Sequence, residues 1–215
     1  MRFSSCLGYL VYGLKLRKNK RLTEKNDITL DWDMAAEKIL YLDLTENSQI
    51  LDIGSKDGKK ANYVINKGQL IMSDISKELY SNTAPFVLSD ATTLPYKDNS
   101  FDLVTIFHVL EHLKNANAAL KEIHRVLKKK GTVLIVTPNV NRFTFIFSYA
   151  LRIISSSHTY PLNPDHVFEY SSSDIENMMK NSRFKFYKIE PIFMGISRIL
   201  RLRRHCDQWL IVARK

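Results

Sequence analysis

The sequence has few cysteines and no long apolar run, and both absences limit what the protein can be. Its only two cysteines, Cys6 and Cys206, stand near opposite ends of the 215 residues. Two distant cysteines provide neither a disulfide framework nor a zinc site, so we expect a reducing, cytoplasmic compartment. The apolar run near the start is too short to span a bilayer, and Lys15 and Arg17 follow it where a secretory signal would show small residues. We therefore predict that residues 1–30 form a basic, amphipathic extension, either packed on the domain or lying at the inner face of a membrane.

Internal repeats and low-complexity tracts are also absent from the sequence. A chain of 215 residues is long enough for one domain with a sizeable core and short for two. We predict a single domain over residues 31–215, in which residues 139–170 form an insertion or lid on the substrate side.

The chain has more basic than acidic residues, which gives it a formal net charge of +10 at pH 7. Such a surplus favours an anionic partner such as RNA, acidic lipid head groups or a phosphorylated metabolite. It is also typical of a lysine-rich solvated surface, and the sequence lacks a recognisable appended RNA-binding module. RNA and peripheral membrane contact therefore stay open as alternatives.

Short apolar runs alternate with helical patterns along the chain, which predicts an α/β fold with a parallel sheet. Five strands are expected first, at Gln49–Ile53, Gln69–Ser73, Pro85–Ser89, Phe101–Phe107 and Thr132–Thr137. The apolar residues of Ala116–Lys128 share one helical face, and we expect Gly131 to stop this helix. The remaining expected elements are a helix at Ser173–Asn181 and two closing strands at Phe184–Ile189 and Gln208–Ala213.

Polar residues follow several of these strands. Asp52, Asp74, Asp90 and His108 fall at or just beyond strand ends. Ligands of parallel sheets bind outside the carboxyl ends of the strands, so this placement predicts a small-molecule site. The glycine turn at Gly54 to Gly58 suits close backbone approach to a ligand, although the dinucleotide pattern G-x-G-x-x-G is missing.

The motifs LDIGSKDG, SDIS, SDATTLPYKDNSFDLV, HVLEHL and EIHRVLKKKGTVLIVTPN occur in this order. Over Ile50–Asn139 the chain thereby resembles class I S-adenosylmethionine-dependent methyltransferases of the ubiquinone and menaquinone type. The resemblance implies a Rossmann-like, mostly parallel sheet of seven strands, with helices on both faces and an antiparallel last strand inserted between the fifth and sixth. It also implies S-adenosyl-L-methionine as cofactor and methyl transfer by in-line displacement to a small-molecule or lipid-precursor acceptor. An RNA (tRNA) methyltransferase and a non-catalytic homologue that binds the cofactor stay open as alternatives.

The same resemblance assigns roles to individual residues. Gly54, Ser55 and Gly58 would form the loop under the methionine portion of the cofactor, and Asp52 would support its amino group. Asp74 would hold the ribose diol, and Asp90 with the amide of Ala91 would bind the adenine. Phe107 and His108 would face the methionine moiety and the methyl group.

One position departs from the family's loop, which usually reads G-x-G-x-G. Lys56 stands where the family has the middle glycine. Its side chain must point away from the cofactor or pair with the cofactor's carboxylate. This departure keeps a non-catalytic homologue among the alternatives.

The segment from His108 to His112 reads H-x-x-E-H, a pattern also found in metalloproteases. Two histidines and a carboxylate bind zinc when they share a helix face, but His108 follows a strand here. We therefore predict no tightly bound metal. A further resemblance, to ubiquinone-type O-methyltransferases, leaves open a divalent ion held by Glu111 and His112.

The substrate is expected to contact the part of the chain outside the repeated pattern of strands and helices. His166 is a candidate catalytic base because it lies in this part, and His108 and His112 compete with it. Phe143 and Phe147 are candidates for an apolar lid over the acceptor. The basic helix expected at Gly195–Arg204 is a candidate contact for phosphate or an anionic surface.

Overall fold

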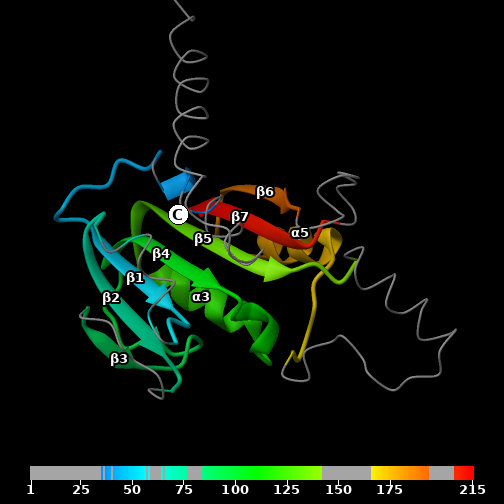
Figure 1. Ribbon diagram of the computed structural model, residues 1–215, viewed down its shortest axis with the longest axis horizontal. Helices are drawn as coiled ribbons and strands as arrows, with labels where there is room; N and C mark the ends of the chain where they lie inside the picture. The colour runs from blue at the N-terminus through cyan, green and yellow to red at the C-terminus, as the bar shows by residue number, and fades with distance from the viewer. Residues whose placement is uncertain are drawn as a thin grey trace, which may run out of the picture.

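The computed structural model describes residues 35, 37–39, 41–56, 58, 64, 66–76, 84–141, 166–193 and 206–215. Their strands form one seven-stranded sheet in the order β3-β2-β1-β4-β5-β7-β6 (Figure 1). The first four strands along the chain are β1 (Gln49–Ile53), β2 (Gln69–Asp74), β3 (Phe86–Leu88) and β4 (Phe101–Phe107). The last three are β5 (Leu127–Pro138), β6 (Phe186–Ile192) and β7 (Gln208–Arg214).

The strands from β1 to β5 pair in parallel, whereas β7 is antiparallel to both of its neighbours, β5 and β6. The last strand along the chain is thus the antiparallel one, and it lies between the fifth and the sixth. This is the expected Rossmann-like class I methyltransferase fold, which the sheet confirms.

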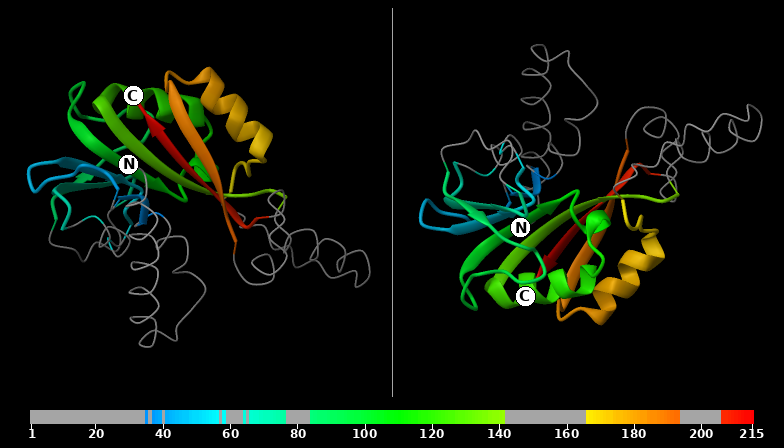
Figure 2. Two further views of the ribbon diagram at one scale, coloured as in Figure 1. Left: turned by 90° about the horizontal axis from the view of Figure 1, so that it is seen from above. Right: turned by 90° about the horizontal axis from the view of Figure 1, so that it is seen from below.

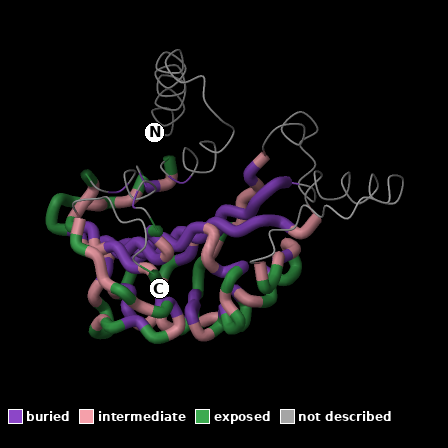
Figure 3. Tube along the Cα trace, turned by 60° about the horizontal axis from the view of Figure 1, so that its bottom comes forward, coloured by how far each residue is buried: buried purple, intermediate pink, exposed green. Residues whose placement is uncertain are grey.

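The central strands are buried on both faces, and successive side chains along each strand serve opposite cores. In β4, for example, Val104 and Ile106 join one buried cluster and Leu103 joins the other. Figure 3 shows buried positions running along the middle of the sheet, with exposed positions mainly in the connections. Burial on both faces explains why these strands are nearly continuous apolar runs in the sequence.

Two helices cover the same face of the sheet (Figure 2). Helix α3 (Ala116–Val126) begins after Asn115, whose side chain accepts a hydrogen bond from the Ala118 amide. Helix α5 (Ser172–Asn181) begins with a capping box formed by Ser171 and Asp174. Both helices therefore start at polar residues that satisfy amides of the first turn, and both bury an apolar stripe.

The expected end of the helix near Gly131 is wrong. Helix α3 ends at Val126, and β5 begins at the next residue, Leu127. Leu127 pairs with Phe101 of β4, and Lys128 forms an ion pair of 2.6 Å with Asp102 of the same strand. These cross-strand contacts place the lysine run of residues 128–130 in the sheet, although its polar character suggested the end of a helix.

Several expectations concern residues outside the described part of the chain. They include the extension over residues 1–30, most of the expected lid over 139–170, and the basic helix expected at Gly195–Arg204. Among the described residues, the structure has no helix long and apolar enough to cross a membrane.

Cys206 is a buried free thiol, and burial raises its pKa to about 12, so this cysteine is chemically inert near neutral pH.

Arg125 near the end of α3 fixes the segment that leads into β4. Its guanidinium bonds Glu122 through Nε at 2.8 Å and Nη2 at 2.7 Å, and it also reaches Asp98 at 2.8 Å. The same guanidinium donates to the carbonyls of Leu94 and Tyr96. The hydrogen bonds from Arg125 lower the pKa of the Glu122 carboxyl below the ordinary glutamate value of 4.5.

We expect Glu122→Gln to lower the free energy of unfolding by about 1–2 kcal/mol at neutral pH, because the two-pronged, charge-assisted contact is lost. Since the pKa of Glu122 is lowered in the folded state, its contribution is present above pH 4.5 and is lost as the pH falls through the folded-state pKa. The free energies of unfolding of wild type and variant, measured with urea, should thus converge as the pH falls into the acidic range. Glu176→Gln, at an exposed position of α5, is the control. A difference that stays constant down to acidic pH would contradict the prediction.

Candidate functional site

A tight turn follows β1 at the carboxyl edge of the sheet, and a buried serine anchors it. The hydroxyl of Ser55 donates to the Asp52 carbonyl at 2.8 Å and accepts from the Ser73 amide at 3.1 Å. The amides of Gly54 and Ser55 both donate to the Ser73 carbonyl. The turn expected to lie under the cofactor is therefore tied to both β1 and β2. Ser55 is completely buried, so it anchors the turn from inside the protein.

Glycine is required at position 54 for two separate reasons. Its φ angle is +75°, a conformation that residues with a Cβ rarely adopt. A Cβ added there would lie 2.1 Å from Cγ2 of Val109, which follows β4. The residues after β4 thus pack directly against the glycine turn. Gly58 also has a positive φ, of 76°, and its amide closes the turn on the Ser55 carbonyl at 2.8 Å.

Lys56 takes the left-handed conformation, with φ of 49°, that a glycine would adopt at this place without strain. Its side chain is exposed, and its amide donates to Oδ2 of Asp74 at 2.8 Å. Asp74, at the end of β2, also accepts from the Ser76 amide at 3.1 Å through Oδ1. The lysine therefore preserves the shape of the turn, and the Asp74 carboxylate holds that turn against β2.

Asp90 and Ala91 follow β3, next to Asp74. Oδ1 of the exposed Asp90 accepts from the amide and the hydroxyl of Thr92, at 2.7 and 2.8 Å, while Ala91 is buried. Ile75 directly follows Asp74, and its side chain is 75% exposed although it is strongly apolar. An apolar side chain left in water beside two carboxylates suits a ligand that has both a flat ring and hydroxyl groups. Nothing in the sequence distinguishes Ile75 from a core residue, because only its exposure in the fold makes it unusual.

Asp52 and Phe107 lie deeper than the other expected cofactor contacts. Oδ1 of the buried Asp52 accepts from the Thr105 hydroxyl at 2.7 Å, which joins β1 to β4. Phe107 packs in one of the two buried clusters. Contact of these two residues with the cofactor stays a prediction.

His108 directly follows β4 and has an unusual backbone, with φ of 57°. Its Nδ1 lies 3.3 Å from Oε1 of Glu111, whose side chain is completely buried. Oε2 of Glu111 accepts from the Thr137 hydroxyl on β5 at 3.1 Å. The short helix η4 (Leu110–His112) starts after His108. The two histidines of H-x-x-E-H therefore do not share a helix face as they would in a metalloprotease.

His166 reaches the same rim of the sheet from the distant segment that precedes α5. Its Nδ1 lies 3.0 Å from Oε1 of Glu169, and both side chains are largely buried. The His166 ring also meets the His112 ring edge to face, with centroids 4.8 Å apart. The backbone brings the segments together, since the Glu111 carbonyl accepts from the amides of Val167 and Phe168. The structure thus unites all three histidines that were candidates for proton transfer.

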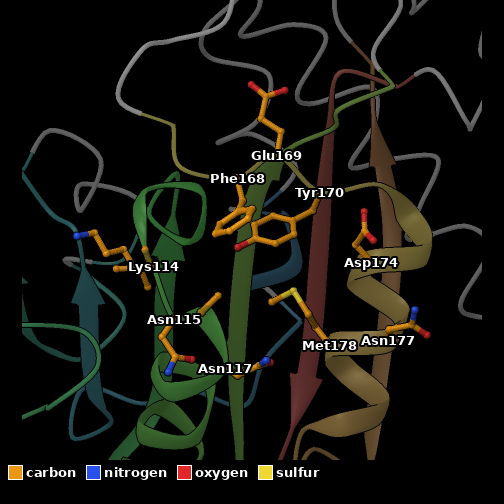
Figure 4. A pocket seen from close by; sticks show the side chains of 11 residues that line it. Lys114, Asn115, Asn117, Phe168, Glu169, Tyr170, Asp174, Asn177 and Met178 are labelled. Atoms are coloured by element: carbon orange, nitrogen blue, oxygen red, sulfur yellow. The ribbon is translucent and has the colours of Figure 1, made fainter.

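A pocket of about 420 Å³ lies beside this rim, between the N-terminal parts of α3 and α5 (Figure 4). Phe168, Tyr170 and Met178 give it an apolar side, and Asn115 and Asn177 add amide groups. In Figure 4 the carboxylate of Glu169 points away from the two aromatic rings. Burial raises the pKa of Tyr170, and the nearby charge of Glu111 raises it further, so the hydroxyl stays protonated and donates to the Leu110 carbonyl.

The residues at the ends of β1 to β3 fit S-adenosylmethionine, the cofactor that the sequence implies. A carboxylate has about four lone-pair positions, so Asp74 can accept from ribose hydroxyls while it keeps its bonds to the backbone. The exposed Ile75 offers a surface for the adenine ring. The exposed Lys56 side chain is free of the protein interior, and its backbone keeps the shape of the turn.

Comparison with known proteins agrees with this geometry. A family described as a methyltransferase domain matches residues 51–135. A ubiquinone/menaquinone biosynthesis C-methyltransferase of Rickettsia prowazekii is 30% identical over 183 residues, covering 70% of this chain and 73% of the relative. A demethylmenaquinone methyltransferase of Thermotoga maritima is 31% identical over 128 residues, which span 53% of this chain and 56% of that protein.

Solved structures show the same fold. A SAM-dependent methyltransferase from Archaeoglobus fulgidus superposes with a TM-score of 0.65, covering 96% of this chain and 99% of that one. Because its sequence identity is only 18%, the likeness supports the fold and does not identify an acceptor.

We expect Gly54→Ala to lower the free energy of unfolding by about 1–3 kcal/mol, because the new Cβ would be strained by the positive φ and would collide with Val109. The double variant Gly54→Ala/Val109→Ala removes the collision and keeps the backbone strain. The double variant should therefore lose less free energy of unfolding than the two single variants lose in sum. Urea unfolding of all four proteins measures the coupling, and strictly additive losses would show that the two residues do not meet.

Proposed function

Because this chain belongs to the class I S-adenosylmethionine-dependent methyltransferases, we propose that it methylates a small molecule carrying a hydroxylated aromatic ring. The observation that supports this proposal best is the meeting of two groups of residues at one edge of the sheet. The glycine turn, Asp74 and Asp90 form one group, and the histidines after β4 and before α5 form the other. The first group suits the cofactor and the second suits an acceptor.

When bound, S-adenosylmethionine supplies a methyl group on a positively charged sulfur, which makes the methyl group an electrophile. The chain's own residues then need to position the acceptor in line and keep water out, and positioning of this kind contributes about 7–11 kcal/mol. In our proposal Asp74 binds the ribose hydroxyls, Ile75 covers the adenine, and Asp90 with Ala91 binds the adenine edge.

Two histidines are in place to act on the acceptor. In each, Nδ1 faces a buried carboxylate, Glu111 for His108 and Glu169 for His166. For His166, this leaves Nε2 as the nitrogen that can face a ligand. His108 directly follows β4, so we assign it to the side of the transferred methyl group, where it can take a proton from the acceptor. His166 lies farther from the glycine turn along the rim, and we assign it to orienting the acceptor.

The choice of a ring compound rests on two supports. The relatives named above are methyltransferases of ubiquinone and menaquinone biosynthesis. The pocket beside the histidines combines the aromatic residues Phe168 and Tyr170 with amide side chains. A flat, hydroxylated ring matches both kinds of lining group.

Calorimetry with S-adenosylmethionine and with its demethylated product tests the cofactor site. We expect wild type to bind both and Asp74→Ala to bind about 10–150-fold more weakly, because the ribose loses a charge-assisted hydrogen-bond acceptor. Asp43→Ala, which removes an exposed carboxylate before β1, is the matched control. Well-folded protein that gives no heat with either compound would overturn the proposed function and support a binding-incompetent homologue.

Radiolabelled S-adenosylmethionine with cell extract tests the acceptor class. We expect the label in a fraction that organic solvent extracts, and we expect nuclease treatment to leave it unchanged. Label that nuclease releases, with activity that falls steeply as salt rises, would contradict a small-molecule acceptor and favour RNA.

A further inference from the structure

Three metal-binding side chains meet at the rim of the sheet, beside the end of β4. Potential ligand atoms of Glu111, His112 and His166 all lie within 4.8 Å of one another. Ligand atoms of one tetrahedral zinc ion lie about 2.0–2.2 Å from it and therefore about 3.3–3.6 Å from one another. Side-chain movements that bring the outermost pair closer by about 1.2–1.5 Å would therefore let these atoms share one ion.

The first observation that points to a cation is the burial of Glu111. Its side chain has no exposed surface, yet Oε1 accepts no hydrogen bond from the described residues. A buried carboxylate oxygen that lacks such a bond is costly unless positive charge compensates it. His108 Nδ1 lies 3.3 Å away, and a divalent cation on the side of His112 and His166 would complete the compensation.

The second observation is the orientation of His166. Glu169 holds Nδ1 of His166 at 3.0 Å, and the Glu169 side chain is itself only 4% exposed. Histidines that bind metal almost always donate their other ring nitrogen to a carboxylate, a carbonyl or water. A buried carboxylate on Nδ1 leaves Nε2 as the ligand atom and fixes the plane of the ring. This pair comes from a segment more than fifty residues away along the chain, so the sequence alone did not supply it as a third ligand.

We propose that Glu111, His112 and His166 bind one divalent transition-metal ion of the zinc type, with Glu169 orienting His166. Two imidazoles and one carboxylate are a common ligand set for Zn²⁺, and three protein ligands leave a position open for water or another oxygen. The ion would sit next to His108, where an oxygen of the acceptor could take the open position, so His166 would orient the acceptor through the ion. That use of the ion rests on the proposed methyl transfer, whereas the metal site does not.

The test measures zinc binding directly, on tag-free protein stripped of metal and without cofactor or acceptor. Titration against a chromogenic chelator should show one Zn²⁺ per chain. His112→Gln and His166→Gln should each weaken binding by at least tenfold, and Glu169→Gln should weaken it by about 10–100-fold as an orienting residue. His124→Gln, near the other end of α3 where His124 contacts Phe184, is the control and should bind as wild type.

Two further measurements separate a metal ligand from an ordinary polar contact. His112 is exposed, so its variants should fold, and urea unfolding checks this. His112→Cys keeps a zinc ligand and should retain most of the affinity that His112→Gln loses. Zinc binding that is absent from wild type, or equally tight in His112→Gln and His124→Gln, would overturn the metal site. Binding of S-adenosylmethionine, measured by calorimetry, does not depend on the outcome of the zinc titration. The proposed methyl transfer and the proposed metal site are therefore tested separately.

Discussion

The hydrogen bonds of one buried hydroxyl fix the turn on which the cofactor site depends. Ser55 bonds the backbone of β1 and of β2 at once, and the Ser73 carbonyl accepts from two successive amides of the turn. With the start of the turn fixed in this way, the amide of Lys56 meets the carboxylate of Asp74. Asp74 and the glycine turn are therefore one structural unit, held by hydrogen bonds to the backbone of the turn.

The same unit explains how a lysine replaces a glycine without disrupting the site. A residue with a Cβ is disfavoured at φ of 49°, by an amount of the order of 1 kcal/mol, yet it can persist where its surroundings determine the backbone. The bonds of Ser55 and Asp74 on either side of the turn provide those surroundings. The Lys56 side chain is exposed, so the substitution affects the backbone energy of the turn and adds no buried side chain to it.

Sequence patterns predicted the sheet well because its central strands are buried on both faces. The apolar runs at Gln49–Ile53 and Phe101–Phe107 have the bounds of β1 and β4. The start of β5 was missed, since residues 128–130 are lysines that lie between Leu127 and Thr132, the two residues that pair with β4 on either side of a register shift. Local polarity indicated the end of a helix there, and only the neighbouring strands could have shown otherwise.

The candidate site was predictable only in part. The ends of strands can be read from the sequence, whereas contacts between distant segments cannot. The acids after β2 and β3 were identified by position alone. The contact of His166 with His112 depends on the segment before α5 folding back onto η4. The sequence pattern of neither segment predicts that the two segments are in contact. The prediction that no metal is tightly bound was made without knowledge of this contact, and it stays a prediction.

The charge of the described site is opposite in sign to that of the whole chain. The net charge is +10, yet the rim of the sheet gathers carboxylates. These are Asp52, Asp74, Asp90, Glu111 and Glu169. Negative charge suits a cofactor with a cationic sulfur and suits a divalent ion, whereas a phosphate-rich acceptor would be repelled there. Basic residues are concentrated in the sequence at Lys15–Lys25 and at Arg198–Arg204, both outside the described residues. The positive charge that favours an anionic partner and the negative charge at the chemical site thus belong to different parts of the chain, so the net charge does not identify the methyl acceptor.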